Sequence, residues 1–369
     1  MDMVILQGTT GEWPSLSLQE RLDMAAAWRE AVPKGSRLKL ILHVGHDSLK
    51  EAQALAEAAV ALEMDAVLVS APSKYIAHTA RRKRFLTPQP QRHCHADRAM
   101  RWAQETHQAQ AVVDILSHCG DIPAFYYHYP QVYGDHFDVY ELMNDIEAEV
   151  ARRGLTAPNL VGAKLSIPLD EAAAAVETIS AAPDNSWGLT VGLLDPSLWD
   201  SAAMQAVILF GWEGPMFHKA LAAWEAGDLD GARAAQDEIL AMRAEYVSLN
   251  HASTTANYQP QGVKAVANAL GFDVGPCRLP LPLVDAGAAE RAAAKVLSIM
   301  ERNDACPDFS MLEVTTEAPA FDWTGVDVTV VPSGGGLTKP LLLLNTVGGY
   351  IGCGLFNIET SNTLKEVAA

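Results

Sequence analysis

The chain of 369 residues has few cysteines, no long apolar run and no visible leader segment. Its five cysteines are scattered and form no CxxC pair, which indicates a reducing compartment rather than a disulfide framework. The longest apolar runs, such as Pro340 to Asn345, are far too short to span a bilayer. Because the chain opens with Met1-Asp2-Met3 and continues directly into an apolar strand, we expect no signal peptide and a cytoplasmic location.

Positive charge is also scarce. The 27 Lys and Arg residues stand against 45 Asp and Glu, so the net charge is −18. An acidic surface repels nucleic acid and anionic membranes, and neither is expected as a partner. The basic run from Arg81 to Arg84 is interpreted as a solvated loop. The apolar fraction of 49% is typical of a soluble globular protein.

The Gly-rich turn of dinucleotide-binding sheets is missing, which disfavours an open doubly wound sheet without excluding it. From Val4 onward, short apolar runs alternate with Ala- and Glu-rich amphipathic segments, a pattern typical of parallel β/α architecture. Strands are expected at Val4–Gln7, Leu38–Val44, Asp65–Ser70, Pro123–Tyr127 and in the run up to Lys164. Helices are expected at Ser17–Ala31, Ser48–Leu62, Tyr140–Arg153 and Glu171–Ala181, and the pattern continues less regularly through Ser201–Ile208 and Met216–Leu249.

The spacing of the strand ends favours a (β/α)8 TIM barrel. Such a barrel needs roughly 30 residues per strand–helix unit. The observed steps are 35, 28, 37 and 28 residues, for Thr9 to Val44, Val44 to Pro72, Tyr127 to Lys164 and Lys164 to Gly192. The step of 55 residues from Pro72 to Tyr127 is too long for one unit. It contains Thr87–His95, which we interpret as an inserted loop.

One lysine, Lys164, lies near the end of an apolar run and is followed by Leu165 and Ser166. Taking an ammonium group out of water is costly, so apolar surroundings favour the neutral amine. A neutral amine can attack a carbonyl carbon and form a Schiff base. The alternative is a surface lysine just beyond a buried strand.

Several polar residues follow or end the expected strands. In a TIM barrel the active site gathers at the carboxyl ends of the strands, so Thr9, Thr10, Tyr127 and Lys164 are expected to converge. Each also has a structural interpretation. Thr9 and Thr10 would cap a helix if Glu12 were their capping partner, and Tyr127 would be an ordinary sheet aromatic.

The histidines are interpreted as supports rather than catalysts. His43 and His128 are expected to be hydrogen-bonded groups around the site. The stretches His93-Cys94-His95 and His118-Cys119 contain metal-binding residue types, but their spacing matches no tetrahedral zinc site. We therefore expect no metal.

Taken together, several separated stretches resemble the pyruvate-dependent class I aldolases, the family of dihydrodipicolinate synthase and N-acetylneuraminate lyase. They are Gly8-Thr9-Thr10-Gly11-Glu12, His43-Val44-Gly45, Ala71-Pro72, Tyr126-Tyr127-His128-Tyr129-Pro130, Val161-Gly162-Ala163-Lys164 and Gly275-Pro276-Cys277-Arg278-Leu279-Pro280. The resemblance covers residues 4–170 apart from 76–117, and returns from about 221 to 283. The Ser15-Leu16-Ser17 run, the Glu20-Arg21 pair, Trp28 and the Tyr-His-x-Pro strand end are most similar to animal-type N-acetylneuraminate lyases.

The resemblance implies a lyase that cleaves N-acetylneuraminate to N-acetylmannosamine and pyruvate. Lys164 would be the Schiff-base lysine and Tyr127 the proton shuttle. A phenol normally titrates near a pKa of about 10, so Tyr127 needs a hydrogen-bonding neighbour such as Thr9. The implied substrate-binding residues are Thr9, Thr10, Gly11, Gly192 and Asp195. The family further implies a homo-oligomer, a tetramer, that needs no cofactor beyond the covalent Schiff base.

The chain departs from the family pattern in three places. It starts at the strand that follows the family's first βα unit, so only seven barrel strands are expected. Gly192-Leu193-Leu194-Asp195 stands where a Gly-x-Asp-Glu is expected, which leaves one carboxylate for sugar hydroxyls. Phe210 to Gly214 stands near the place of a Gly-Ser-Thr-Tyr-Asn turn. These departures keep two alternatives open: another pyruvate or 2-keto acid aldolase, such as a dihydrodipicolinate-synthase-like enzyme, or a catalytically inactive barrel.

Two domains are expected. Residues 1–302 would form the aldolase-type barrel with C-terminal helices, and residues 303–369 a small, incomplete α/β tail rich in β-strand. The stretch from Gly348 to Thr360 resembles part of a small prokaryotic domain of unknown function. Cys353 lies between glycines there and is interpreted as a packed small residue, with a reactive thiol as the alternative.

Overall fold

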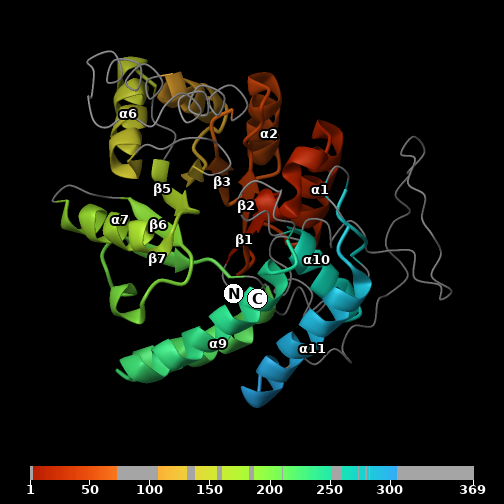
Figure 1. Cartoon of the computed structure of the whole chain (residues 1–369). Coiled ribbons are helices and arrows are strands. Elements are labelled where there is room, and N and C mark those ends of the chain that lie inside the picture. The colour runs from red at the N-terminus through yellow and green to blue at the C-terminus, as the bar shows by residue number, and fades with distance from the viewer. Residues whose placement is uncertain are drawn as a thin grey trace, which may run out of the picture.

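The computed structural model describes residues 3–72, 107–130, 138–155, 160–182, 187–209, 211–250, 260–272, 274–278, 281 and 283–305. They contain one seven-stranded parallel sheet that curls into a half-barrel (Figure 1). The strands follow chain order: β1 Met3–Leu6, β2 Lys39–His43, β3 Ala66–Val69, β4 Ala124–His128, β5 Leu160–Leu165, β6 Gly188–Val191 and β7 Met204–Val207. The expectation of an α/β fold with seven parallel strands is confirmed.

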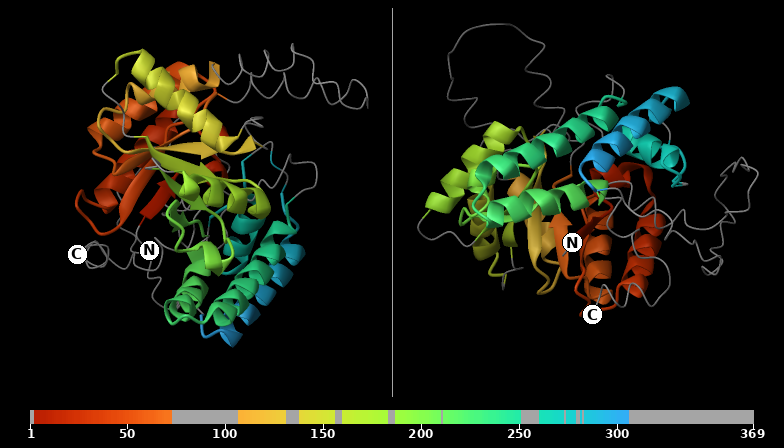
Figure 2. Two further views of the ribbon diagram at one scale, coloured as in Figure 1. Left: turned by 90° about the vertical axis from the view of Figure 1, so that its left-hand side faces the viewer. Right: turned by 90° about the horizontal axis from the view of Figure 1, so that it is seen from below.

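Helices cover the outer face of the sheet, and a second group packs beside it (Figures 1 and 2). The outer helices are α1 Leu18–Ala31, α2 Leu49–Ala61, the helical residues 107–116, α6 Val139–Arg152 and α7 Leu169–Ala181. The second group is α8 Gly214–Glu225, α9 Leu229–Val247, α10 Pro260–Ala269 and α11 Ala286–Arg302. In this group α9 contacts α8, α10 and α11, which makes a helical extension of the barrel.

Local signals explain where these helices begin. At α1, Ser17 and Glu20 form a capping box, in which each side chain accepts a hydrogen bond from the other residue's backbone N–H. Ser48 precedes α2 as expected, but its side chain makes no capping bond. The stretch Met216–Leu249 divides into α8 and α9 because Gly227 has a φ of 78° and Asp228 caps the next helix.

The alternation of side chains along each strand gives the sheet two apolar layers. Val4, Leu6, Leu40, Leu42 and their counterparts in the other strands point outward and pack under the helices. The other set points inward and consists of Ile5, Ile41, Ala66, Leu68, Phe125 and Tyr127, which form a smaller cluster with Trp13 of the turn after β1 and Tyr129 after β4. Polar inward positions are concentrated toward the carboxyl ends of the strands, at Lys164, Thr190 and His43.

Some sequence expectations fall outside the described residues. They include the basic run 81–84, the proposed inserted loop 87–95, the paired His93 and His95, and the tail from 306 onward with Cys306 and Cys353. The barrel-and-tail division therefore stays a prediction. Helix α11 ends at Arg302, where the first domain was expected to end.

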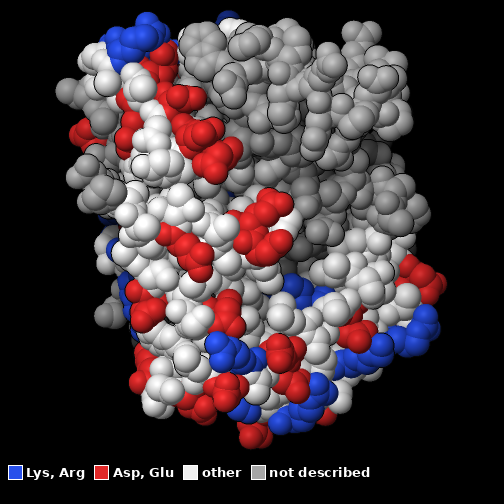
Figure 3. All heavy atoms as spheres, turned by 60° about the vertical axis from the view of Figure 1, so that its left-hand side comes forward, with Lys and Arg blue, Asp and Glu red and all other residues white. Residues whose placement is uncertain are grey.

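Acidic side chains are spread over the molecular face drawn in Figure 3, and the basic side chains lie beside them, mostly in the lower part of the view. Within the described ranges, no helix combines the length and the hydropathy needed to cross a membrane.

Candidate active site

The expected site residues of four strands meet at the carboxyl edge of the sheet. Thr9 follows β1, His43 ends β2, Tyr127 lies near the end of β4 and Lys164 near the end of β5. In the parallel register Tyr127 is opposite Lys164, and Lys164 is opposite Thr190 of β6. Because paired residues point to the same face, all three side chains project inward.

Lys164 is buried because the side chains along strand β5 point alternately to the outer and the inner face of the sheet. Its neighbours Ala163 and Leu165 pack outward under the helices, which turns Gly162, Lys164 and Ser166 inward. The side chain of Lys164 is 5% exposed. Its Nζ donates to Ser166 Oγ at 3.2 Å and lies 3.9 Å from the ring centre of Tyr127. The interpretation of Lys164 as a surface lysine is therefore wrong.

Strands β5 and β6 approach closely at Gly162. A Cβ atom there would lie 1.8 Å from the carbonyl oxygen of Gly188, a distance that real contacts do not show. Glycine at this position therefore permits the strand pairing that brings Lys164 opposite Thr190.

The Tyr127 hydroxyl joins the β1 turn to the lysine strand. Tyr127 is 2% exposed, and its hydroxyl lies 3.1 Å from Thr9 Oγ1, where either group can donate. Ser166 Oγ donates to the same phenol oxygen at 3.5 Å. Burial raises the pKa of Tyr127, but the positive charge of Lys164 and the hydrogen bonds from Ser166 and Thr9 outweigh it, so the pKa is lower than usual. The phenol is thus easier to ionise than an isolated tyrosine.

The turn after β1 is a short 3-10 helix, Thr9–Gly11. Gly11 N–H donates to Gly8 O at 2.9 Å and Glu12 N–H donates to Thr9 O at 3.1 Å. The residue at the N-cap position is Gly8, with no side-chain capping bond, while Thr9 contacts Tyr127. The helix-capping interpretation of Thr9 and Thr10 is therefore wrong.

His43 is a fully buried support for the site. Its Nδ1 lies 3.1 Å from Gln7 O, which only accepts, so Nδ1 carries the proton and Nε2 accepts from Ser70 Oγ at 3.2 Å. Its ring meets the Tyr127 ring edge-on, with centroids 5.8 Å apart. Burial, followed by the charges of Arg21 and Lys164, holds the pKa of His43 well below its usual value. A hydrogen-bonded histidine was expected here.

Gly192 and Asp195 lie beyond the end of β6. Gly192 is half-buried, whereas Asp195 is exposed and caps the 3-10 helix Pro196–Leu198. The Asp195 carboxylate accepts from Ser197 N and Oγ, at 3.0 and 2.6 Å. Arg233 of α9 donates to it through Nε at 2.9 Å and Nη2 at 3.1 Å. Hydrogen bonds from Arg233 and Ser197 lower the pKa of Asp195. Its described contacts are thus with its own capped turn and with the helical extension.

The described residues include two cysteines, Cys119 and Cys277. Cys119 and Cys277 are buried thiols, and burial raises the pKa of each to about 12. Within the same residues, no three His, Cys, Asp or Glu side chains are grouped as metal ligands would be.

Comparison with known proteins shows what the chain is similar to. A sequence profile described as the dihydrodipicolinate synthetase family matches residues 1–83. The N-acetylneuraminate lyase of Danio rerio is 24% identical over 303 residues, which cover 79% of this chain and 83% of that protein. The Gallus gallus lyase is 31% identical over 163 residues, which cover 44% of this chain and 42% of the lyase. The chain is thus similar to the dihydrodipicolinate synthase and N-acetylneuraminate lyase family, by the profile over its first 83 residues and by these two relatives.

The fold of the family is found among solved structures. The N-acetylneuraminate lyase of Proteus mirabilis superimposes with a TM-score of 0.59 at 20% sequence identity, covering 80% of this chain and 85% of that chain. The seven-stranded half-barrel therefore corresponds to the TIM-barrel structures of this family.

Sequence reasoning about the family missed two parts of the site. Ser166, which contacts both Lys164 and Tyr127, was not singled out, although a residue two positions after the lysine on the same strand must share its face. Arg21 was quoted in a motif without a role. It is fully buried, and it donates to Gln7 Oε1 at 2.8 Å, to Gly45 O at 2.9 Å and to His43 O. Arg21 thus joins the ends of β1 and β2.

Proposed function

We propose that the chain is a Schiff-base lyase that cleaves N-acetylneuraminate to N-acetylmannosamine and pyruvate. The observation that carries this proposal is the row from the buried Lys164 Nζ through the half-buried Ser166 Oγ to the buried Tyr127 OH and Thr9 Oγ1, with successive distances of 3.2, 3.5 and 3.1 Å. An amine next to a phenol of lowered pKa combines a nucleophile with a proton acceptor in one buried site.

In the first stage, Lys164 Nζ attacks the keto carbon of the substrate. A carbon–nitrogen bond forms, the carbonyl oxygen leaves as water after taking up protons, and an iminium ion results. The row of hydroxyls between Lys164 and Tyr127 can relay these protons because each group both accepts and donates.

In the second stage, the Tyr127 phenolate takes the proton from the substrate hydroxyl on the carbon that becomes the aldehyde, which is one end of the bond that breaks. The electron pair of the carbon–carbon bond moves into the iminium ion, which becomes an enamine, and the aldehyde product leaves. Proton return from Tyr127 to the enamine carbon restores the iminium ion. Water then releases pyruvate and the free Lys164 amine.

We assign the keto-acid carboxylate to the turn after β1. Gly11 and Glu12 use their N–H groups within the turn, so the carboxylate would be held by the Thr9 and Thr10 amides and by the Thr10 hydroxyl. Gly11 leaves room for the ligand because it lacks a side chain. This assignment places the carboxylate beside Tyr127, to which Thr9 is hydrogen-bonded.

One observation favours a second candidate, an aldolase acting on another 2-keto acid. Asp195, the one carboxylate expected to bind sugar hydroxyls, is engaged by Ser197 and doubly by Arg233. A substrate with a shorter or less hydroxylated aldehyde half would not need it. Both candidates share Lys164 chemistry and differ only in the acceptor side.

Pyruvate release from purified protein tests the two candidates. The lyase proposal requires pyruvate to form from N-acetylneuraminate with wild-type protein and not with Lys164→Ala. Release from other 4-hydroxy-2-keto acids, with none from N-acetylneuraminate, would replace the first candidate by the second. Absence of release from every substrate, together with absence of covalent pyruvate capture, would indicate an inactive barrel.

A further inference from the structure

The two residues that bracket the turn after β1 have unusual backbone conformations. Gln7 has a φ of 57° and Glu12 a φ of 56°, the left-handed region that residues other than glycine rarely adopt. Both are buried, with exposures of 0% and 4%. Backbone strain of this kind persists only where surrounding contacts enforce it. The contacts of these two side chains therefore determine the shape of the turn.

Glu12 is bound by residues that are distant in the sequence, Lys264 and Arg278. Its Oε2 lies 2.7 Å from Nζ of Lys264 in α10, and the two side chains are 4% and 2% exposed. Its Oε1 accepts from the backbone N–H of Arg278 at 3.0 Å. Lys264 Nζ also donates to Pro276 O at 2.9 Å. Residues 252 positions apart thus form one buried, hydrogen-bonded ion pair.

The same segment fixes the residues that follow the turn. Arg278 Nη2 donates to Glu20 Oε1 at 2.6 Å, and its Nη1 donates to Ser15 O and Glu20 Oε2, each at 3.1 Å. Glu20 also accepts from Ser17 in the capping box of α1. The turn is therefore fastened to α10 by Lys264 and to α1 by Arg278.

The other end of the turn is fastened within the barrel. Gln7 Nε2 donates to Arg21 O at 2.6 Å, and Gln7 Oε1 accepts from Arg21 Nε at 2.8 Å. This contact involves only the end of β1 and α1. The distinctive contribution of the helical extension is the hold of Lys264 on Glu12.

We propose that Lys264 is a positioning residue of the active site, and that it acts through Glu12 on the turn carrying Thr9 and Thr10. This inference rests on the proposed function, because the turn is the assigned carboxylate cradle. Two well-packed apolar side chains would often stabilise a fold as well as a buried ion pair does, so stability gives little reason for charges here. The charged pair, together with two further hydrogen bonds to the backbone, does fix the orientation of the Glu12 side chain. A turn that binds a carboxylate needs its N–H and hydroxyl groups held in a fixed orientation.

The test is a double-substitution cycle with Lys264→Met, Glu12→Gln and the combined variant. Each single variant leaves one buried group without its counterpart. We expect each to weaken pyruvate binding by about 10- to 100-fold, the effect of a misplacement near 1 Å, with a smaller change in kcat than in KM. In the combined variant the glutamine side chain introduced by Glu12→Gln can still accept from Arg278 N–H and faces no buried charge. We expect it to regain at least about tenfold of the loss.

Arg243→Met is the matched control. Arg243 forms an ion pair with Glu213 in the same helical extension, with side chains 19% and 0% exposed, and Tyr246 also donates to Glu213. We expect Arg243→Met to have a lowered melting temperature, as Lys264→Met and Glu12→Gln do, but an unchanged pyruvate affinity. Equal loss of affinity in Arg243→Met and Lys264→Met would show a general effect of instability and overturn the proposal. Additive losses in the combined variant would overturn it as well.

Hydrogen–deuterium exchange supplies a readout that does not need activity. The Gly11 and Glu12 amides are bonded within the turn, and we expect them to exchange at least about tenfold faster in Lys264→Met and at the wild-type rate in Arg243→Met. If wild-type protein captures no pyruvate, the proposed function fails and this exchange still tests the positioning role. An unchanged exchange rate of these amides in Lys264→Met would contradict the proposal that Lys264 fixes the turn through Glu12.

Discussion

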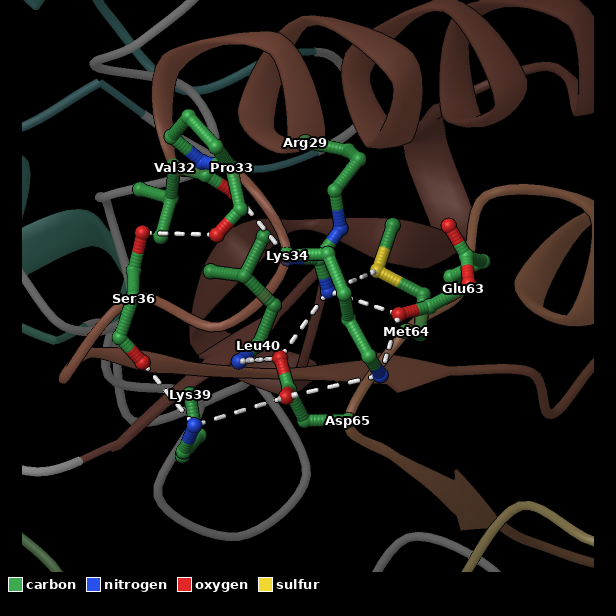
Figure 4. A network of polar contacts seen from close by, with 10 residues as sticks. All are labelled: Arg29, Val32, Pro33, Lys34, Ser36, Lys39, Leu40, Glu63, Met64 and Asp65. Carbon is green, nitrogen blue, oxygen red and sulfur yellow. Dashed lines mark hydrogen bonds and ion pairs between the residues drawn. The ribbon is translucent and has the colours of Figure 1, made fainter. Parts of the chain in front are cut away.

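Charged side chains at the two ends of the sheet have different surroundings. At the amino end, Asp65 precedes β3 and forms ion pairs with three basic side chains (Figure 4). Its Oδ2 lies 2.9 Å from Arg29 Nη2 and 3.1 Å from Leu40 N, and its Oδ1 lies 3.7 and 3.8 Å from the amines of Lys34 and Lys39. Burial raises the pKa of Asp65, but these contacts outweigh it and the pKa falls below its usual value.

At the carboxyl end, the groups around the Lys164 amine are hydroxyls and an aromatic face. Lys164 Nζ donates to Ser166 Oγ and lies over the ring of Tyr127. The amino end thus surrounds a carboxylate with opposite charges, while at the carboxyl end a buried amine lies beside hydroxyl groups and an aromatic ring. In TIM barrels the amino face is generally associated with stability and the carboxyl face with catalysis. The comparison predicts that substitutions at the two ends change different properties.

Tyr127→Phe should produce the largest effect, and at the carboxyl end only. Removing the phenol removes the proton acceptor, so cleavage should fall by about 10²–10⁴-fold while covalent capture of pyruvate is partly retained. Steady-state cleavage rates and borohydride capture on the same preparation measure both. A fall of less than about tenfold would contradict the role of Tyr127 as a proton shuttle.

The double variant Thr9→Val, Thr10→Val should come next. Valine keeps the shape but removes the Thr10 hydroxyl assigned to the carboxylate and the Thr9 hydroxyl that contacts Tyr127. One hydrogen bond to a charged group contributes about 1.5–3 kcal/mol, so pyruvate affinity should fall by about 10- to 150-fold, with little change in melting temperature. A clear loss of melting temperature with unchanged affinity would show that these hydroxyls serve the fold and not the substrate.

Asp65→Asn should affect stability and leave catalysis unchanged. The neutral amide of the variant cannot form an ion pair with Arg29, so the free energy of unfolding at neutral pH should fall by about 1–2 kcal/mol. The folded-state pKa of Asp65 is lowered, so its stabilisation is full above the unfolded-state value of about 3.9 and disappears as pH falls through the folded-state value. Denaturant unfolding of both proteins at neutral and acid pH should show the difference shrinking in acid. A difference that is independent of pH would contradict the ionic role of Asp65.

Lys164→Met should have the smallest effect on stability, with the opposite sign. The variant replaces a buried amine by an apolar side chain of similar length, so the free energy of unfolding should rise by up to about 1 kcal/mol while activity is lost. Thermal unfolding of wild-type and variant proteins tests the sign. A clear destabilisation would show that the Lys164 amine contributes to the fold as the Asp65 carboxylate does.

Local sequence patterns predicted the strands and the convergence of the site well. The strand expected at Leu38–Val44 is β2, Lys39–His43, and the alternation along β5 turns Lys164 inward. Such patterns work because the period of a strand and the parallel register are local rules that repeat in every unit.

Contacts between distant segments could not be predicted in this way. Nothing near Glu12 in sequence indicates Lys264, and nothing near Asp195 indicates Arg233. The partner of a buried charge depends on how helices outside the barrel pack against it, which a single sequence does not encode in any short pattern. The contact between Thr9 and Tyr127 was expected from the family resemblance and not from any local pattern.

The most direct test of the reactive carboxyl end is covalent capture of pyruvate. Wild-type protein is incubated with pyruvate, reduced with sodium borohydride and digested, and the modified peptide is identified by mass spectrometry. We predict one adduct, on the peptide that contains Lys164, which is absent without pyruvate and absent from Lys164→Ala. Failure of the wild-type protein to form the adduct, or an adduct that persists in Lys164→Ala, would contradict the assignment of Lys164 as the Schiff-base lysine.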